Sequence, residues 1–82
     1  MLFRSFTEQP DATAPATAGA ALAESYYQQS RSRLEDARAA AKRATELAPE
    51  SGFAWTRLAE LEFSFGRTRA AREALEIGRA HV

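Results

Sequence analysis

The stretch LAPESGFAWTRLAEL, from Leu47 to Leu61, places a proline directly before an amphipathic run that aromatic residues lead. Pro49 has no backbone N–H and disfavours helix in the residue before it, so we expect a helix to end there. Ser51 can cap a new helix, because its side-chain oxygen can accept a hydrogen bond from a free backbone N–H. Trp55 and the apolar residues after it recur at helical spacing. The stretch therefore predicts the joint between two helices.

Composition and charge limit the possible functions. The chain has 82 residues, of which 45% are hydrophobic and 27% are charged, as in one small domain or a piece of one. Lys and Arg together number 11, as do Asp and Glu, so the formal net charge is zero and no overall field favours nucleic acid. The absence of cysteine excludes disulfides and thiolate metal sites. No apolar run approaches the roughly 20 residues that span a bilayer, so we expect no membrane insertion.

The sequence changes character near Ala18. Residues 1–17 contain Pro10, Pro15 and alternating Ala and Thr without apolar periodicity, which predicts a disordered linker. Residues 18–82 have apolar residues at helical spacing almost throughout, which predicts four helices. The first of these helices would bury three side chains: Leu22, Ala23 and Tyr26.

Local patterns predict the other helix ends. Ser32 followed by Glu35 matches a capping box, with which the second helix would begin. Gly66 can take the left-handed conformation that closes a third helix, and a fourth would follow. In the third helix we expect Trp55 to be part of the core, because small residues such as Ala59 leave room for its ring.

The four helices pair into two similar units. A single shift superposes the second helix on the fourth, with Ala37 on Ala71 and Arg38 on Arg72, and the length of this shift is that of a known repeat. The first and third helices superpose at a slightly longer shift, with Leu22 on Leu58, so the first turn would hold two extra residues. Insertions in a surface turn cost little. The sequence therefore predicts two helical hairpins joined at Pro49.

These units resemble tetratricopeptide repeats, a family of stacked helical hairpins with a characteristic pattern of aromatic, leucine and small residues. In the first unit the matching residues are Leu22, Ala23, Tyr26, Ala37, Ala41, Ala44 and Pro49. In the second unit they are Trp55, Leu58, Ala59, Gly66, Ala71 and Leu75. Gly19 and Glu62 depart from the pattern, because they stand where the family has aromatic residues. The resemblance implies an all-α fold, with two tandem antiparallel hairpins in an α–α superhelix.

Further features bear on the origin of the chain. The phrase AESYYQQSR is similar to repeats of large bacterial envelope proteins that carry an upstream FecR-like domain, and this resemblance leaves both the cytoplasm and the envelope open. The final residues 77–82, IGRAHV, match the translation of a common sequencing-library adapter, so we expect a fragment whose last repeat is truncated and whose last six residues carry no selected function. The alternative is an ordinary helix end with Gly78 at a small-residue position.

The family resemblance also implies a function. The first helices of tetratricopeptide repeats line a concave groove that holds a peptide or a partner protein. Given the expected core of the first helix, six residues would face that groove: Glu24, Tyr27, Gln28, Thr56, Glu60 and Phe63. The groove would be mildly acidic with two aromatic rings, which favours a basic or neutral extended segment. Glu24 and Glu60 argue against the family's carboxylate-clamp variety, which needs basic residues and Asn.

A second interpretation is purely structural. The repeats would then act as a scaffold, either as a spacer or as a self-association segment that uses an open C-terminal repeat end, and the six groove residues would be the polar sides of amphipathic helices. Neither interpretation involves catalysis. The sequence has no glycine-rich phosphate loop, no metal-ligand spacing and no nucleophile paired with a base, so we expect no enzyme, no cofactor and no metal site.

Overall fold

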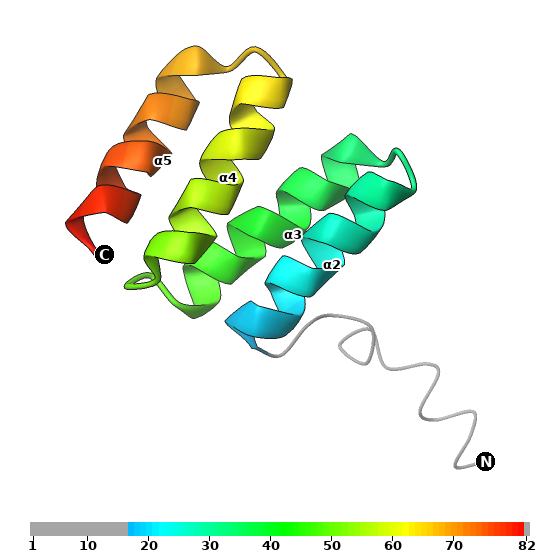
Figure 1. Cartoon of the computed structure of the whole chain (residues 1–82), viewed down its shortest axis with the longest axis horizontal. Helices are drawn as coiled ribbons and strands as arrows, with labels where there is room; N and C mark the ends of the chain where they lie inside the picture. Colours follow the sequence, from blue (N-terminus) through cyan, green and yellow to red (C-terminus); the bar gives the residue numbers. More distant parts are fainter. Residues whose placement is uncertain (1–16, 82) are drawn as a thin grey trace.

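Four helices account for most of residues 17–81, the part of the chain that the computed structural model describes (Figure 1). They are α2 (Ala18–Ser30), α3 (Leu34–Leu47), α4 (Gly52–Ser64) and α5 (Thr68–Ala80). Residues 17–81 contain no strand, and the all-α prediction is confirmed. The predicted linker lies, except for Thr17, outside the described residues.

The helices form two hairpins that stack in chain order. Helix α2 packs against α3 and helix α4 packs against α5, each pair antiparallel (Figure 1). Helix α4 also packs against α3 and, at fewer places, against α2, so it joins the two hairpins. The predicted arrangement of two tandem antiparallel hairpins is therefore confirmed.

The two hairpins repeat at a constant interval along the chain. The interval from the start of α2 at Ala18 to the start of α4 at Gly52 equals that from the start of α3 at Leu34 to the start of α5 at Thr68, and we call it the repeat interval. Each hairpin turn has the same three-residue length, residues 31–33 in the first and 65–67 in the second. Even the left-handed residues correspond, because Ser32 has φ 61° and Gly66 has φ 75°. The longer shift predicted for the first helix pair, with two extra residues in the first turn, is wrong.

Capping follows the same repeat. The hydroxyl of Thr17 accepts a hydrogen bond from the N–H of Ala20 at 3.1 Å, and the hydroxyl of Ser51 accepts one from the N–H of Ala54 at 3.2 Å. The Ser51 cap and the left-handed Gly66 are as predicted. The capping box is not, because α3 has Arg33 at its N-cap without a side-chain hydrogen bond. The serine expected there lies in the left-handed turn position instead.

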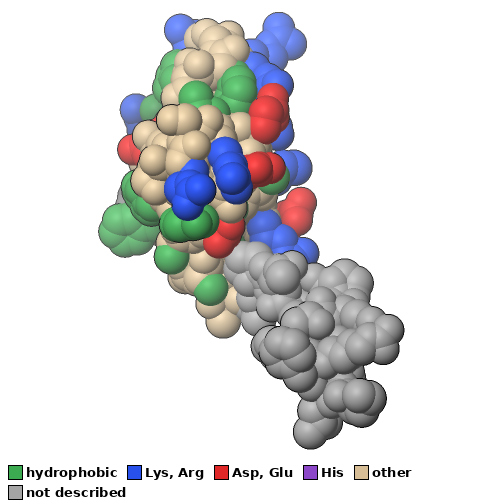
Figure 2. Space-filling model, turned by 90° about the vertical axis from the view of Figure 1, so that its right-hand side faces the viewer, with side chains coloured by type: hydrophobic (Ala, Val, Ile, Leu, Met, Phe, Trp, Pro, Cys, Tyr) green, Lys and Arg blue, Asp and Glu red, His purple; other side chains and the backbone are tan. Residues whose placement is uncertain are grey.

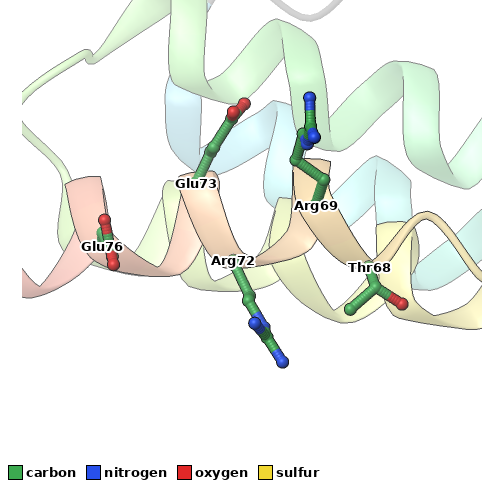
Figure 3. Close-up of a pocket in the computed structure, with 5 residues that line it drawn as sticks. All are labelled: Thr68, Arg69, Arg72, Glu73 and Glu76. Carbon is green, nitrogen blue, oxygen red and sulfur yellow. The ribbon is translucent and has the colours of Figure 1, made fainter.

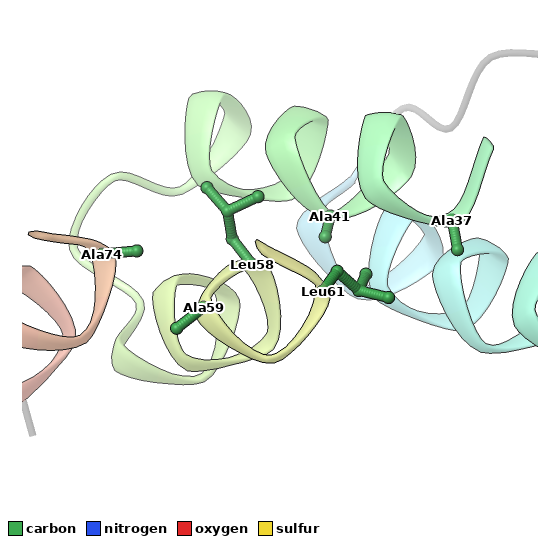
Figure 4. Close-up of a cluster of buried hydrophobic side chains, with 6 residues drawn as sticks. All are labelled: Ala37, Ala41, Leu58, Ala59, Leu61 and Ala74. Carbon is green, nitrogen blue, oxygen red and sulfur yellow. The ribbon is translucent and has the colours of Figure 1, made fainter. Parts of the chain in front are cut away.

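The core between the hairpins consists mainly of alanine. One cluster joins α3, α4 and α5 (Figure 4) and contains Ala37, Ala41, Leu58, Ala59, Leu61 and Ala74. A second cluster joins the hairpins at Ala21, Ala44 and Ala54. Small side chains let helix backbones approach closely, and this approach leaves little room for variation in side-chain volume. Leu61, which is 1% exposed, is the largest fully buried side chain.

Trp55 and Gly78 show how closely the second hairpin packs. Trp55 is half-buried against the first cluster, in line with its expected place in the core, and its indole N–H donates to the carbonyl oxygen of Pro49 at 2.7 Å. Gly78 is buried near the end of α5, where an added Cβ would lie only 3.2 Å from the carbonyl oxygen of Gly52. Gly78 thus occupies the position that Ala44 has in the first hairpin, and a small residue is needed at both.

The first helix is rotated relative to the prediction. Its buried residues are Ala21 and Ser25, whereas Ala23 is exposed and Tyr26 is 57% exposed. Leu22 is partly buried and packs against the second cluster, as expected. The prediction assumed that the largest side chains are buried. In this helix, however, the buried positions are taken by two small residues, Ala21 and Ser25, and the larger side chains next to them point outward.

Candidate partner-binding surface

A buried arginine joins the first helices of the two hairpins. Arg57 of α4 is only 5% exposed and reaches across to α2. Its Nε donates to the hydroxyl oxygen of Ser25 at 2.9 Å, and its Nη2 donates to Oε1 of Gln29 at 2.6 Å. A buried guanidinium is costly unless its donors are satisfied. These bonds therefore hold α2 and α4 in one fixed register.

The same guanidinium positions two side chains at the surface. Its central carbon lies 3.8 Å from the ring centroid of Tyr26, within the range of a cation–π interaction. Its Nη1 donates to Oε1 of Glu60 at 3.1 Å. Arg57 thus fixes an exposed aromatic ring on α2 and an exposed carboxylate on α4, and its charge balances that carboxylate.

Phe53 extends this exposed surface along α4. It lies in the first turn of the helix and is 83% exposed, the highest value among the large apolar side chains of residues 17–81. Residues seven apart lie on nearly the same side of a helix, so Phe53 and Glu60 share one face. The core does not use the ring of Phe53, so nearly all of its apolar area is open to contact. We call Tyr26, Phe53 and Glu60, together with Arg57 beneath them, the inner surface.

Sequence reasoning missed Arg57 and its partners on α2. A signal for it exists, because Arg57 falls between Ala54 and Leu61 on the same side of α4, and both of these residues are buried. The spacing alone would place Arg57 in the core, but a charged side chain is not normally expected there.

Three of the predicted groove residues, Thr56, Glu60 and Phe63, are exposed on α4. One repeat interval earlier, they correspond to Leu22, Tyr26 and Gln29 of α2. In the first hairpin these three equivalents lie toward the second hairpin, where the last two contact Arg57. The set on α4 therefore lies on the side of the second hairpin that faces away from the first, with Glu60 also on the inner surface.

The other three predicted groove residues lie at the opposite end. Glu24, Tyr27 and Gln28 correspond to Leu58, Leu61 and Glu62, which contact the preceding hairpin. The side-chain amide of Gln28 donates to the carboxylate of Glu24, and both residues are half-buried. Tyr27 is half exposed, with its hydroxyl accepting from Nη1 of Arg31 at 3.3 Å. The structure therefore does not bring the two predicted sets together on one surface.

A buried carboxylate forms a second polar link between the hairpins. Glu62 of α4 lies 3.0 Å from Nη2 of Arg38 in α3 and 3.4 Å from Nη1 of Arg67. The hydrogen bond from Arg38, more than the nearby positive charge, holds the pKa of Glu62 below its ordinary value, although burial opposes this shift. The same hydrogen bond raises the pKa of Arg38. The ionised pair is therefore part of the folded structure at neutral pH.

Replacement of Glu62 by glutamine should lower the free energy of unfolding at pH 7 by about 2 kcal/mol, because Arg38 loses a charged acceptor. A depressed folded-state pKa contributes stability above the unfolded pKa of about 4.3 and loses it as the pH falls through the folded value. Urea unfolding at pH 7, 4.5 and 3 should therefore show the gap between wild type and variant closing in acid. An exposed control is Glu73→Gln. A gap that stays constant over this range would contradict the account.

Other features of the described surface do not form a site. The face in Figure 2 carries Lys and Arg next to Asp and Glu, without a patch of one sign. A hollow along α5 is lined by five residues of that helix alone: Thr68, Arg69, Arg72, Glu73 and Glu76. Arg69 and Glu73 point to one side of the helix and Thr68 and Arg72 to the other, so they do not converge on one point (Figure 3). Within residues 17–81, no group of His, Asp and Glu side chains could hold a metal ion. No helix of this range is long and apolar enough to cross a membrane.

No family model, curated protein or solved structure matches the chain in the three comparisons. The geometry of the inner surface is therefore the guide to a function for this chain.

Proposed function

We propose that the chain is a tetratricopeptide-repeat-like module that binds an extended segment of a partner protein on the inner surface. The support comes from the arrangement of the helices and from the contacts of a few residues on the inner surface. The paired helices recur at a constant repeat interval, which matches the length of about 34 residues that is typical of that family. Stacked hairpins of this kind present their first helices, here α2 and α4, along one extended surface.

The main support for the proposal is that two exposed aromatic rings, Tyr26 and Phe53, share the inner surface with the carboxylate of Glu60. Tyr26 and Glu60 are both held by Arg57, so little side-chain freedom is lost when a partner contacts them. Phe53 offers a large apolar area that is open to solvent. Aromatic side chains of this kind are frequent hot spots of protein interfaces. Apolar side chains of the partner would pack on the two rings.

The charge of the inner surface refines the choice of partner. Arg57 neutralises Glu60, so the surface has little net charge, but the carboxylate keeps a second oxygen for an N–H donor. A strongly acidic segment would place its carboxylates next to that of Glu60, and Arg57 is already paired with Glu60. The preferred partner is therefore a neutral or mildly basic extended segment that contains apolar or aromatic residues.

Selection of peptides from a random display library, followed by titration of the best binders, tests this function. Phe53→Ser and Tyr26→Ala should each weaken binding about 10-fold or more, in the range of interface hot spots. Phe63→Ser is the matched control, because Phe63 is another exposed phenylalanine of α4 but lies outside the inner surface. The affinity of the Phe63→Ser variant for the selected peptides should be unchanged.

The outcomes separate two functions. Peptides that lose affinity with Phe53→Ser and keep it with Phe63→Ser support a binding module. Failure to select any peptide sensitive to Phe53 or Tyr26 would favour the structural alternative, in which the repeats serve as a spacer.

A further inference from the structure

The inner surface offers its contact groups at two levels along the helix axes. Phe53 lies in the first turn of α4, and Glu60 lies two turns further on. Tyr26 of α2 is at the level of Glu60, because the guanidinium of Arg57 contacts both side chains. At a rise of 1.5 Å per residue, the two levels are about 10 Å apart. A ligand that uses all three groups must therefore extend along α4, with an apolar group at the start of the helix and a donor near the carboxylate.

The sequence contains a segment with these properties in residues 2–6, outside the described part of the structure. They read Leu-Phe-Arg-Ser-Phe, with three large apolar side chains, one cation and no acidic residue. In an extended segment alternate side chains point to the same side and lie about 7 Å apart. Leu2, Arg4 and Phe6 would therefore share one side. The segment thus matches the neutral or mildly basic ligand that the inner surface favours.

The connection from residues 2–6 to α2 is long enough to reach the inner surface. Helices α2 and α4 begin at the same end of the molecule (Figure 1), where Thr17 caps α2. Helices in contact lie about 8–10 Å apart, and α2 contacts α4. Residues 7–16 join the segment to Thr17, and a random coil of that length spans roughly 17 Å on average. The start of α4 is therefore within reach of the segment.

We propose that residues 2–6 bind in extended form on the inner surface of their own chain, with Phe6 on Phe53 and Arg4 paired with Glu60. The second carboxylate oxygen of Glu60 accepts the guanidinium of Arg4, since Arg57 donates to Oε1. The length of an arginine side chain accommodates the difference between 7 Å along the segment and 10 Å along α4. Leu2 then lies toward the level of Tyr26.

This inference rests on the proposed function, because it uses the same surface and the same class of ligand. A segment tethered by a short linker has an effective concentration in the millimolar range, so even weak affinity keeps it bound for much of the time. A partner segment must then displace residues 2–6. The apparent affinity of the chain for a partner is therefore lower than that of an open inner surface.

A nitroxide spin label on the segment tests the contact in the full chain. The sequence has no cysteine, so Ser5→Cys provides a single attachment site. Ser5 would be on the side of the segment that faces away from α4, and the label should not disturb the contact. Amide NMR signals around Phe53 and Tyr26 should be weakened about 3-fold or more relative to that of Arg69. Arg69 is the reference, because α5 begins at the opposite end of the molecule (Figure 1).

Two variants should restore the weakened signals: Phe53→Ser on the surface and Arg4→Glu on the segment. The matched controls are Phe63→Ser, outside the inner surface, and Glu8→Gln, in the connecting residues, and both should keep the weakening. Signals that are not weakened, or that stay weakened in Phe53→Ser, would overturn the proposal. So would weakening that appears only when a spin-labelled copy is mixed with an isotope-labelled one, because the contact would then be between chains.

Peptide titration separates this result from the proposed function. Arg4→Glu should raise the affinity for selected peptides about 2- to 5-fold, because the segment no longer occupies the surface. Peptides that depend on Phe53, in a chain whose spin label shows no contact, would overturn self-binding alone. A contact seen by the label, together with failure of the Arg4→Glu variant to select any peptide, would support self-binding and contradict the proposed function.

Discussion

Replacement of Leu61 by alanine should destabilise the fold by about 3–4 kcal/mol, the largest effect expected of any single truncation here. Leu61 is the largest fully buried side chain, and it lies in the cluster that joins α3, α4 and α5. Its neighbours include alanines, which have no flexible side chains with which to fill a cavity. The cost should therefore approach the upper part of the usual range for Leu→Ala.

Urea unfolding followed by circular dichroism measures this effect. Leu47→Ala is the control, because Leu47 is 37% exposed at the end of α3 and its truncation should cost about 1 kcal/mol or less. For a domain of this size, each kcal/mol corresponds to about 4–8 °C in the melting temperature. Comparable losses in the two variants would show that the core is not organised around Leu61.

Arg57→Ala should cost about 2–3 kcal/mol, because the change removes both a packed side chain and a set of charged hydrogen bonds. The guanidinium donates to Ser25 and Gln29 of the other hairpin, and the side chain as a whole is buried. Its loss leaves the buried Ser25 hydroxyl without a donor. We also expect weaker peptide binding, because Tyr26 and Glu60 lose the group that positions them.

The exposed Arg31 is a matched control for Arg57. Each arginine lies near a tyrosine of α2, and the Arg31 guanidinium is 5.8 Å from the ring centroid of Tyr27. Arg31 is exposed, however, so Arg31→Ala should change stability by less than about 0.5 kcal/mol. Equal effects in thermal melts would mean that Arg57 is a surface residue in solution.

These predictions share one physical origin. Alanine-rich contacts bury little apolar area per residue, so the core offers a modest hydrophobic contribution. Polar groups therefore matter more to the alignment of the two hairpins, and they are concentrated at Arg57 and at the Arg38–Glu62 pair. Their hydrogen bonds form in only one alignment of the hairpins, which disfavours shifted arrangements of one hairpin on the other.

Much of the local structure could be predicted from the sequence alone. The end of α3 before Pro49, the cap at Ser51 and the left-handed Gly66 depend on backbone chemistry that single residues impose. The relation between α3 and α5 was also accessible, because alanines at equal spacing recur in both helices, one repeat interval apart. These features do not require knowledge of distant contacts.

The register of α2 and the composition of the surfaces were decided by tertiary structure. Sequence periodicity favours burial of Tyr26, but the close approach of α2 to its neighbours selects Ala21 and Ser25. That rotation moved Glu24 and Tyr27 to one end of the stack, away from the exposed residues of α4. It also gave Arg57 its partners, which lie in the other hairpin and far from it in the sequence. Helical periodicity determines which residues share a face of one helix, but only packing between helices determines which face is buried.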